Sequence, residues 1–320
     1  MMDRGQMEVV CLGILVADLF ADPIDALPEA GQLKVTDRFL LSAGGCATNT
    51  AACLRRLGRT VKVLGKVGVD LFGDFVLEDL ERLGIDASNI NRSKTHPTSG
   101  TCIVNIKGED RRYIHCLGAN ADFSLSDVDL SALDDARVLY VGGYMAMPGF
   151  GPGDLIGLFQ AAKDRSMTTV LDVVVPAGTA VTLEKWKPIL DLTDVFLPND
   201  DEAQAITNHS DPATQAKILV DLSPNCTVVI TQGPDGCCAR QGSEFIQIPA
   251  YRVGSVDESG AGDAFAAGFL TGMLEEWTLE RTLQFAGVVG ASCTRALGCH
   301  AGVFNFDEAL AFLAEQSSPN

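Results

Sequence analysis

The sequence lacks any continuous apolar run long enough to cross a membrane, and its N-terminus lacks a basic region followed by an apolar segment. A membrane-spanning helix needs about 20 predominantly apolar residues, and a secretory signal needs both of those N-terminal parts. Because neither signal is present, the sequence predicts no secretion and no membrane partner. We therefore expect a cytoplasmic protein.

The ten cysteines and four histidines lack the spacings that mark metal sites and disulfide scaffolds. Neither a Cys-x-x-Cys pair nor a His-Glu-x-x-His pair occurs anywhere in the chain. Disulfide scaffolds are typical of small secreted domains, and zinc sites need paired ligands. The cysteines are therefore expected to be free thiols, most of them buried in apolar strands.

Positive charge is also scarce, because 24 Lys and Arg stand against 42 Asp and Glu, for a net charge of −18. Such a surface repels phosphate backbones, which argues against a nucleic-acid partner. A single phosphate group can still bind where backbone N–H groups, a helix N-terminus and Mg²⁺ supply local positive potential. The composition therefore allows a nucleotide ligand.

Apolar residues alternate between strand-like and helix-like spacing along most of the 320-residue chain. The pattern predicts a strand over 7–15, a helix over 47–57, a strand over 60–64 and helical spacing from Phe72 to Leu83. Further strands are predicted over Val138–Val141, Thr169–Val175, Val195–Leu197 and Thr227–Thr231. This alternation is typical of an α/β fold with a mostly parallel sheet covered on both faces.

Two stretches break the alternation, at about 18–42 and 99–116. The second has strand-like segments on either side of a polar turn at 108–112, which predicts a β-hairpin. No internal repeat or long linker divides the chain, and 47% of its residues are hydrophobic. We therefore predict one α/β domain over 1–320 with a small β insertion.

A glycine-rich turn at 257–263 leads directly into an apolar helical run. Gly260, Ala261 and Gly262 leave no bulky side chain between their backbone N–H groups and a ligand, so they could hold a transferred phosphoryl group. Asp263 beside them could accept the proton of an attacking hydroxyl. The alternative is that Asp263 caps its helix and the glycines only make a tight turn.

This stretch resembles the second signature of the ribokinase-like (PfkB) carbohydrate kinases, Asp-Thr-x-Gly-Ala-Gly-Asp, and keeps both aspartates and Gly-Ala-Gly. The resemblance implies a ribokinase-like fold with a small β-sheet lid. It also implies an ATP-dependent phosphotransferase that phosphorylates a hydroxyl, expected to be a primary CH₂OH, of a sugar or sugar derivative, with Asp263 as base.

Further short motifs in the family's order extend the resemblance over essentially the whole chain. Gly44, Gly45 and Asn49 are similar to the first signature, and Asp18 to the N-terminal substrate-binding Asp. By the same resemblance Asn199 and Glu202 would organise Mg²⁺ and phosphate, with Glu202 acting through water. The nucleotide would be bound by Thr231, Gly233 and Gly236. The segment that follows the lid hairpin in the family is similar to Gly118-Ala119-Asn120. Alone, each motif has a structural reading as a turn, a helix cap or hairpin glycines.

The family also implies a monovalent cation, usually K⁺, near the anion site, for which Asp257 and Ser259 occupy the expected places. The two stretches at about 18–42 and 99–116 resemble the lid that closes over the substrate. In the family this lid can pair with a second subunit. By analogy we expect a possible homodimer through the lid.

Several residues depart from the family pattern and keep two alternatives open. Glu258 replaces the usual Thr, and its negative charge could weaken nucleotide binding unless it points to solvent. Val16 stands where ribokinases carry Asn, and their sugar-contacting Glu is missing near Val141. These last two departures argue against ribose. Tyr144, Met145 and Met147 could line a less polar pocket for a nucleoside, and Arg111 and Arg112 could reach a substrate anion from the hairpin. The alternatives are a nucleoside kinase of adenosine-like substrates and a non-catalytic sugar- or nucleotide-binding regulator.

Overall fold

The computed structural model describes residues 7–109, 112–176, 178–179 and 182–317. Its main sheet has eight strands in the order β14-β13-β12-β11-β10-β9-β1-β4. Neighbouring strands from β12 to β4 are parallel, whereas β13 and β14 are antiparallel additions at one edge. The strands are β1 (Val9–Gly13), β4 (Val61–Leu64), β9 (Val138–Tyr144), β10 (Thr168–Val173), β11 (Val195–Phe196), β12 (Thr227–Thr231), β13 (Cys237–Gln241) and β14 (Glu244–Ile248).

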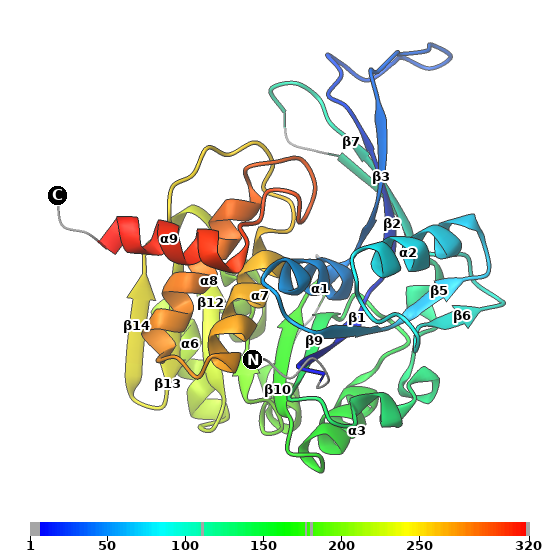
Figure 1. Ribbon diagram of the computed structural model, residues 1–320. Coiled ribbons are helices and arrows are strands. Elements are labelled where there is room, and N and C mark those ends of the chain that lie inside the picture. The colour runs from blue at the N-terminus through cyan, green and yellow to red at the C-terminus, as the bar shows by residue number, and fades with distance from the viewer. Residues whose placement is uncertain (1–6, 110–111, 177, 180–181, 318–320) are drawn as a thin grey trace.

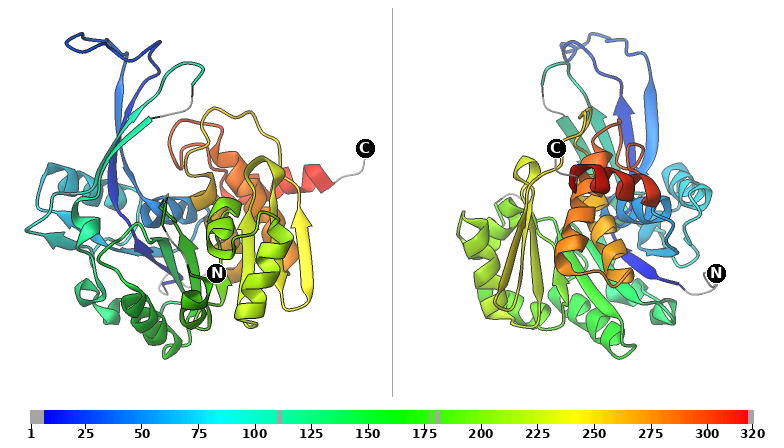
Figure 2. Two further views of the ribbon diagram at one scale, coloured as in Figure 1. Left: turned by 180° about the vertical axis from the view of Figure 1, so that it is seen from behind. Right: turned by 60° about the vertical axis from the view of Figure 1, so that its left-hand side comes forward.

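Helices cover both faces of the sheet, as the three layers in Figure 2 show. One layer contains α1 (Cys46–Arg56), α2 (Leu71–Arg82), α7 (Ala261–Leu274), α8 (Leu279–Cys293) and α9 (Phe306–Ser317). The other contains α3 (Pro152–Lys163), α4 (Lys187–Leu190), α5 (Asp200–Thr207) and α6 (Pro212–Leu222). The predicted fold class is therefore confirmed.

The alternation of side chains along β1 explains this layering. Val9 and Cys11 belong to the hydrophobic cluster shared with α1, α7 and α8, whereas Val10 and Leu12 belong to the cluster on the opposite face. All four side chains are fully buried. Successive side chains of a strand point to opposite faces, so a continuous apolar run must lie between two helical layers.

A second sheet projects from the main body (Figure 1). Its four strands run in the order β3-β2-β7-β8, with β2 (Val16–Ala21), β3 (Phe39–Gly44), β7 (Gly100–Val104) and β8 (Arg112–Cys116). Only Ile14 and Leu15 separate β1 from β2, so this sheet begins at the carboxyl end of a central strand. Its strands come from the two stretches that interrupt the α/β alternation in the sequence.

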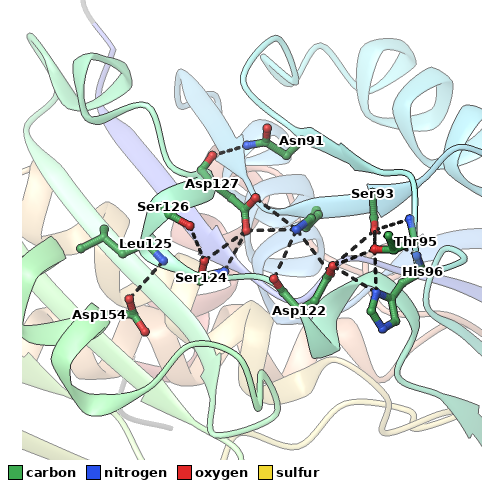
Figure 3. A network of polar contacts seen from close by, with 11 residues as sticks. Asn91, Ser93, Thr95, His96, Asp122, Ser124, Leu125, Ser126, Asp127 and Asp154 are labelled. Atoms are coloured by element: carbon green, nitrogen blue, oxygen red, sulfur yellow. Dashed lines mark hydrogen bonds and ion pairs between the residues drawn. The ribbon is translucent and has the colours of Figure 1, made fainter.

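A polar network attaches a small two-stranded sheet, β5 (Lys66–Gly68) and β6 (Asn91–Ser93), to the loops that follow the second sheet. Lys66 is buried and forms ion pairs with Asp122 and Asp127 at 3.3 and 3.1 Å. Figure 3 shows both carboxylates with their further partners, among them Ser124 and His96. Because the charges of this cluster are paired with one another, the cluster stabilises the fold.

None of the described helices is long and apolar enough to cross a membrane.

Candidate active site

The predicted glycine turn forms the start of α7, and no side chain caps this helix. Gly260 has a left-handed backbone with φ 75°, and a Cβ there would lie 2.6 Å from the Cβ of Cys299. Only glycine fits both conditions. Gly262 is exposed and faces open space. The first turn of α7 therefore has backbone amides that no side chain caps, although the amide of Ala261 donates to the carbonyl of Glu258 at 3.4 Å.

The first signature lies at the start of α1, which also has no side-chain cap. Gly45 has φ 91°, and a Cβ at this residue would lie 2.3 Å from the carbonyl oxygen of Ile14. One turn later, the Nδ2 of Asn49 donates a 2.8 Å hydrogen bond to Oδ2 of Asp263. Helices α1 and α7 lie side by side (Figure 1). The structure thus joins two motifs that are 214 residues apart in the sequence.

Asp18 lies on β2, next to the glycine pair. It is only 8% exposed, and a Cβ at Gly44 on the paired strand would lie 1.9 Å from its Oδ2. The structure gives a reason for both glycines, because Gly44 makes room for the Asp18 carboxylate and Gly45 has the positive φ.

Burial perturbs the two carboxylates that meet at this place. It raises the pKa of Asp263 to about 6, against the hydrogen bonds from Asn49 and Cys46, and the charge of Asp18 raises the pKa further. Burial also raises the pKa of Asp18 to about 6, while a hydrogen bond from Thr101 lowers it. A carboxylate with a pKa just below neutral can be ionised at pH 7 and still accept a proton during a reaction.

Asp172 on β10 is a further carboxylate of this region, and sequence reasoning missed it. The hydroxyl of Tyr140 donates to its Oδ2 at 2.8 Å, and the hydroxyl of Thr50 donates to Tyr140 at 3.3 Å. Burial, followed by the charges of Asp263 and Glu202, raises the pKa of Asp172 well above its usual range. The available signal was a lone Asp inside an apolar strand, near the carboxyl edge of a parallel sheet.

Asn199 and Glu202 form a reciprocal capping box at the start of α5. The Asn199 amide N–H donates to Oε2 of Glu202 at 2.9 Å, and the Glu202 amide donates to Oδ1 of Asn199 at 2.8 Å. The capping alternative therefore describes their contacts within the chain. Burial raises the pKa of Glu202 to about 7, although hydrogen bonds from the amides of Asn199 and Val175 lower it. The charge of Glu202 in turn raises the pKa of Asp172.

Thr231 ends β12 and pairs with Asn199 through an isolated parallel bridge. The next residues make a short turn into β13, and the Gln232 amide donates to the carbonyl of Gly236 at 2.8 Å. Gly233 and Gly236 have φ 52° and 97°, and a Cβ at Gly236 would lie 2.1 Å from the carbonyl oxygen of Ile248. The turn itself therefore requires glycine at 236.

Asp257 is buried and accepts hydrogen bonds from the amides of Ser259 and Gly298, both at 3.0 Å. The Cys293 thiol donates to the carbonyl of Ser259 at 3.3 Å. These contacts fix the turn before α7 against the loop after α8. The side chain of Glu258 is exposed, so its charge is turned to solvent.

The residues named for a less polar pocket mostly pack in the core. Tyr144 and Met147 are 4% and 1% exposed, and the rings of Tyr144 and Trp186 pack edge to face with centroids 6.2 Å apart.

The two other groups of predicted residues lie near the second sheet. Arg112 is exposed and paired with Glu109 at 2.6 Å, while Arg111 lies outside the described residues. Asn120, which follows the second sheet, bonds both backbone groups of Leu15.

A family model described as pfkB family carbohydrate kinase matches residues 6–303, so the chain belongs to this family. Ribokinase from Mus musculus is 28% identical over 303 residues, covering 91% of this chain and 90% of the relative. Adenosine kinase from Saccharomyces cerevisiae is 27% identical over 297 residues, covering 86% of each chain.

Solved structures agree on the fold. Arabidopsis thaliana ribokinase, determined with ribose and ATP, covers 97% of this chain and 99% of its own, with a TM-score of 0.80 at 23% identity. An Escherichia coli structure in complex with ATP and Mg²⁺ covers the same shares, with a TM-score of 0.81 at 20% identity. The chain is accordingly an ATP-dependent kinase of a sugar or nucleoside, and the comparisons do not favour a non-catalytic regulator.

Proposed function

We propose that the chain transfers the γ-phosphoryl group of ATP to a hydroxyl, expected to be a primary CH₂OH, of a sugar or sugar derivative. Asp263 acts as the base. The observation that carries this proposal is the hydrogen bond of 2.8 Å between Asn49 and Asp263 at the uncapped start of α7. It joins a side chain suited to holding a polyol to a carboxylate suited to accepting a proton.

The residues of the chain divide the work. Asp18 and Asn49 bind and orient the alcohol, and Asp263 removes the proton of the attacking hydroxyl. The amides of Gly260, Ala261 and Gly262 stabilise the charge on the transferred group, helped by the positive end of α7. In water-poor surroundings fixed dipoles need no reorganisation during the reaction. The alcohol is therefore bound and deprotonated where α1 and α7 converge.

The carboxylates of Asp172 and Glu202 fit a magnesium ion, because Mg²⁺ prefers oxygen ligands and both groups are partly buried beside other negative charges. No group of three or more metal-binding side chains occurs among the described residues. A role through water, with phosphate oxygens completing the shell, suits that arrangement. When bound, Mg²⁺ would neutralise phosphate charge. Asn199, Thr231, Gly233 and Gly236 would bind the nucleotide.

Several finer assignments complete the proposal. K⁺ is proposed near the turn of Asp257 and Ser259, where Asp257 is buried and accepts a hydrogen bond from the Ser259 amide.

The second sheet, from about 18–42 and 99–116, is proposed to be a lid over the substrate within a single domain. Phe39 and Ile114 on it are 64% and 71% exposed, which supports pairing with a second copy of the chain. The protein is proposed to be cytoplasmic, without nucleic-acid or membrane partners.

A coupled ADP-release assay tests the function, with D-ribose, D-fructose, other polyols, adenosine, inosine and cytidine as alcohols, each with and without K⁺. We expect Mg²⁺-dependent ADP release with at least one sugar or nucleoside, and the departures from ribokinase predict that D-ribose is a poor one. Preference for adenosine over every sugar would select the nucleoside-kinase alternative. Absence of alcohol-dependent ADP release across the panel would contradict the proposal.

A further inference from the structure

Four polar residues form a row across the second sheet, one on each strand. Asp18 on β2 lies directly opposite Ser42 on β3 and Thr101 on β7, and Thr101 lies opposite His115 on β8. Side chains of directly opposed residues share one face of a sheet. Oδ2 of Asp18 lies against Gly44, the residue before the start of α1, so this face is turned toward the active site. The row therefore runs from the reacting carboxylate onto the outer strand.

Hydrogen bonds connect Asp18, Thr101 and His115 and fix the direction of the protons between them, whereas Ser42 donates to the carbonyl of Ala43 at 3.2 Å. The Thr101 side chain hydrogen-bonds the Asp18 carboxylate, and its Oγ1 lies 3.0 Å from Nδ1 of His115. A carboxylate only accepts, and a hydroxyl has a single proton, so Thr101 donates to Asp18 and accepts from His115. Desolvation lowers the pKa of His115, which favours the neutral ring. A neutral ring with its proton on Nδ1 has a bare acceptor at Nε2.

The charged groups around the row restrict what can bind beside it. Asp18, Asp172, Glu202 and Asp263 form no ion pair with any Lys or Arg in the described part of the chain. Their strongest charged neighbours are other carboxylates. A phosphate or carboxylate on the alcohol substrate would meet this negative potential without a partner.

We infer that Thr101 and His115 extend the alcohol site across the second sheet, and that Nε2 of His115 selects a neutral alcohol presenting an O–H or N–H donor there. The inference rests on the proposed function and narrows it to uncharged, hydroxyl-rich substrates. An acceptor at this position gains a hydrogen bond from a hydroxyl, whereas an ionised phosphate or carboxylate oxygen offers it no proton. His115 thereby becomes a specificity-determining residue, and Thr101 a positioning residue for Asp18.

The arrangement of protons is tested without any substrate. Long-range ¹H–¹⁵N spectra of the full chain labelled at histidine report which ring nitrogen carries the proton, and His115→Asn identifies the signal among four histidines. We expect the Nδ1–H tautomer in the wild type, its loss in Thr101→Val and its retention in Thr101→Ser. A wild-type Nε2–H tautomer, or an unchanged spectrum in Thr101→Val, would overturn the inference.

Kinetics test the selection itself, with D-ribose, D-fructose and adenosine as neutral alcohols and gluconate and fructose 6-phosphate as anionic ones. Asn at 115 keeps an N–H toward Thr101 but cannot reach the position of Nε2. We therefore expect His115→Asn to raise KM for the preferred neutral alcohol roughly three- to tenfold, the range of one hydrogen bond. The kcat value and KM for ATP should stay close to those of the wild type.

Cys116→Ser is the matched control, because Cys116 is the adjacent exposed residue on the opposite face of the same strand. It should leave KM for the alcohol unchanged. If the wild type phosphorylates neutral alcohols but His115→Asn keeps the wild-type KM, the inference fails and the proposed function stands. A wild type that prefers an anionic alcohol also overturns the inference alone. A wild type inactive on every alcohol overturns both.

Discussion

Helices of this protein begin in two different ways. Side chains cap α2, α5, α6 and α8, where Asp70, Asn199, Asp211 and Thr278 each accept a hydrogen bond from an amide in the first turn. Helices α1 and α7 begin instead at Gly45 and Gly260, which have positive φ and no capping side chain. A glycine at the N-cap costs only a few tenths of a kcal/mol relative to a capping side chain, so its use at two converging helices calls for a reason other than stability.

The reason lies in what the uncapped ends face. The Asn49–Asp263 hydrogen bond joins α1 to α7, and Asp18 acts on Asp263 across the same space. A capping side chain would occupy the amides that an anion needs. Helices α3 and α4 also lack a capping side chain, but neither begins at a glycine with positive φ. The comparison therefore contrasts side-chain caps, which serve stability, with the glycine starts of α1 and α7, which leave the helix dipoles available to a ligand. Substitutions at both kinds of helix start should separate loss of activity from loss of stability.

The largest effect is expected for Asp263→Asn at the uncapped start of α7. The amide has nearly the same shape as the carboxylate but cannot accept the proton, so kcat should fall by about 10²–10⁴, the usual contribution of a general base. Binding of ATP, measured by calorimetry, should stay close to that of the wild type. Near-normal turnover would remove Asp263 from the mechanism.

Gly260→Ala should follow, because the new methyl group meets Cys299 and the backbone has φ 75°. We expect kcat to fall about 100-fold through displaced amides, together with a loss of about 1–2 kcal/mol of unfolding free energy from the left-handed backbone. Gly58→Ala is the control, since Gly58 has φ 83° with open space around it. It should lose similar stability and keep its kcat. Equal kcat losses in both variants would contradict the special role of residue 260.

Asn49→Ala should change the pH dependence of the reaction. The base must be ionised, so kcat/KM should fall below a pH of about 6 in the wild type. The hydrogen bond from Asn49 favours the ionised carboxylate, and its removal should raise the pKa of Asp263 by roughly one unit, the size expected for a hydrogen bond to a charged group. The acid limb of the kcat/KM profile should move to higher pH. If the acid limb of the kcat/KM profile stays in place or moves to lower pH, Asn49 does not favour the ionised form of Asp263.

The smallest effect is expected at a capped helix. Asp211 accepts hydrogen bonds from the amide and the hydroxyl of Thr214 at 2.9 and 2.6 Å. Asp211→Ala should cost about 1 kcal/mol of stability in urea denaturation, as caps do, without changing kcat or KM. A clear kcat loss in this variant would show that capped helix starts also serve catalysis. It would contradict the distinction drawn between the capped helices and α1 and α7.

The sequence predicted the fold class, because buried parallel strands have continuous apolar runs. The strand at Thr227–Thr231 matches β12, and β9 continues beyond its predicted end through Gly142 and Gly143, residues that weaken a strand pattern. The hairpin of β13 and β14 was not predicted. Its strands contain Arg240, Gln241 and Gln247, so their alternation is weak.

The candidate site depended far more on the resemblance to a family than on local patterns. No periodicity relates Asn49 to Asp263, and the contact of Gly44 with Asp18 depends on the pairing of two strands. Asp172 escaped notice because a single polar residue in an apolar run carries no motif. Cross-strand register and long-range packing decide such contacts, and both arise only after the chain has folded.

The central claim is that the amides at the start of α7, which no side chain caps, receive the transferred phosphoryl group. It is tested most directly by amide ¹H–¹⁵N spectra of the full chain, recorded on adding ADP, Mg²⁺ and aluminium fluoride as a mimic of that group, together with the preferred alcohol. We predict that the largest shift changes occur at Gly260, Ala261 and Gly262, with little change at the capped start of α6. Unchanged signals at 260–262, with the main changes at a capped helix, would contradict it.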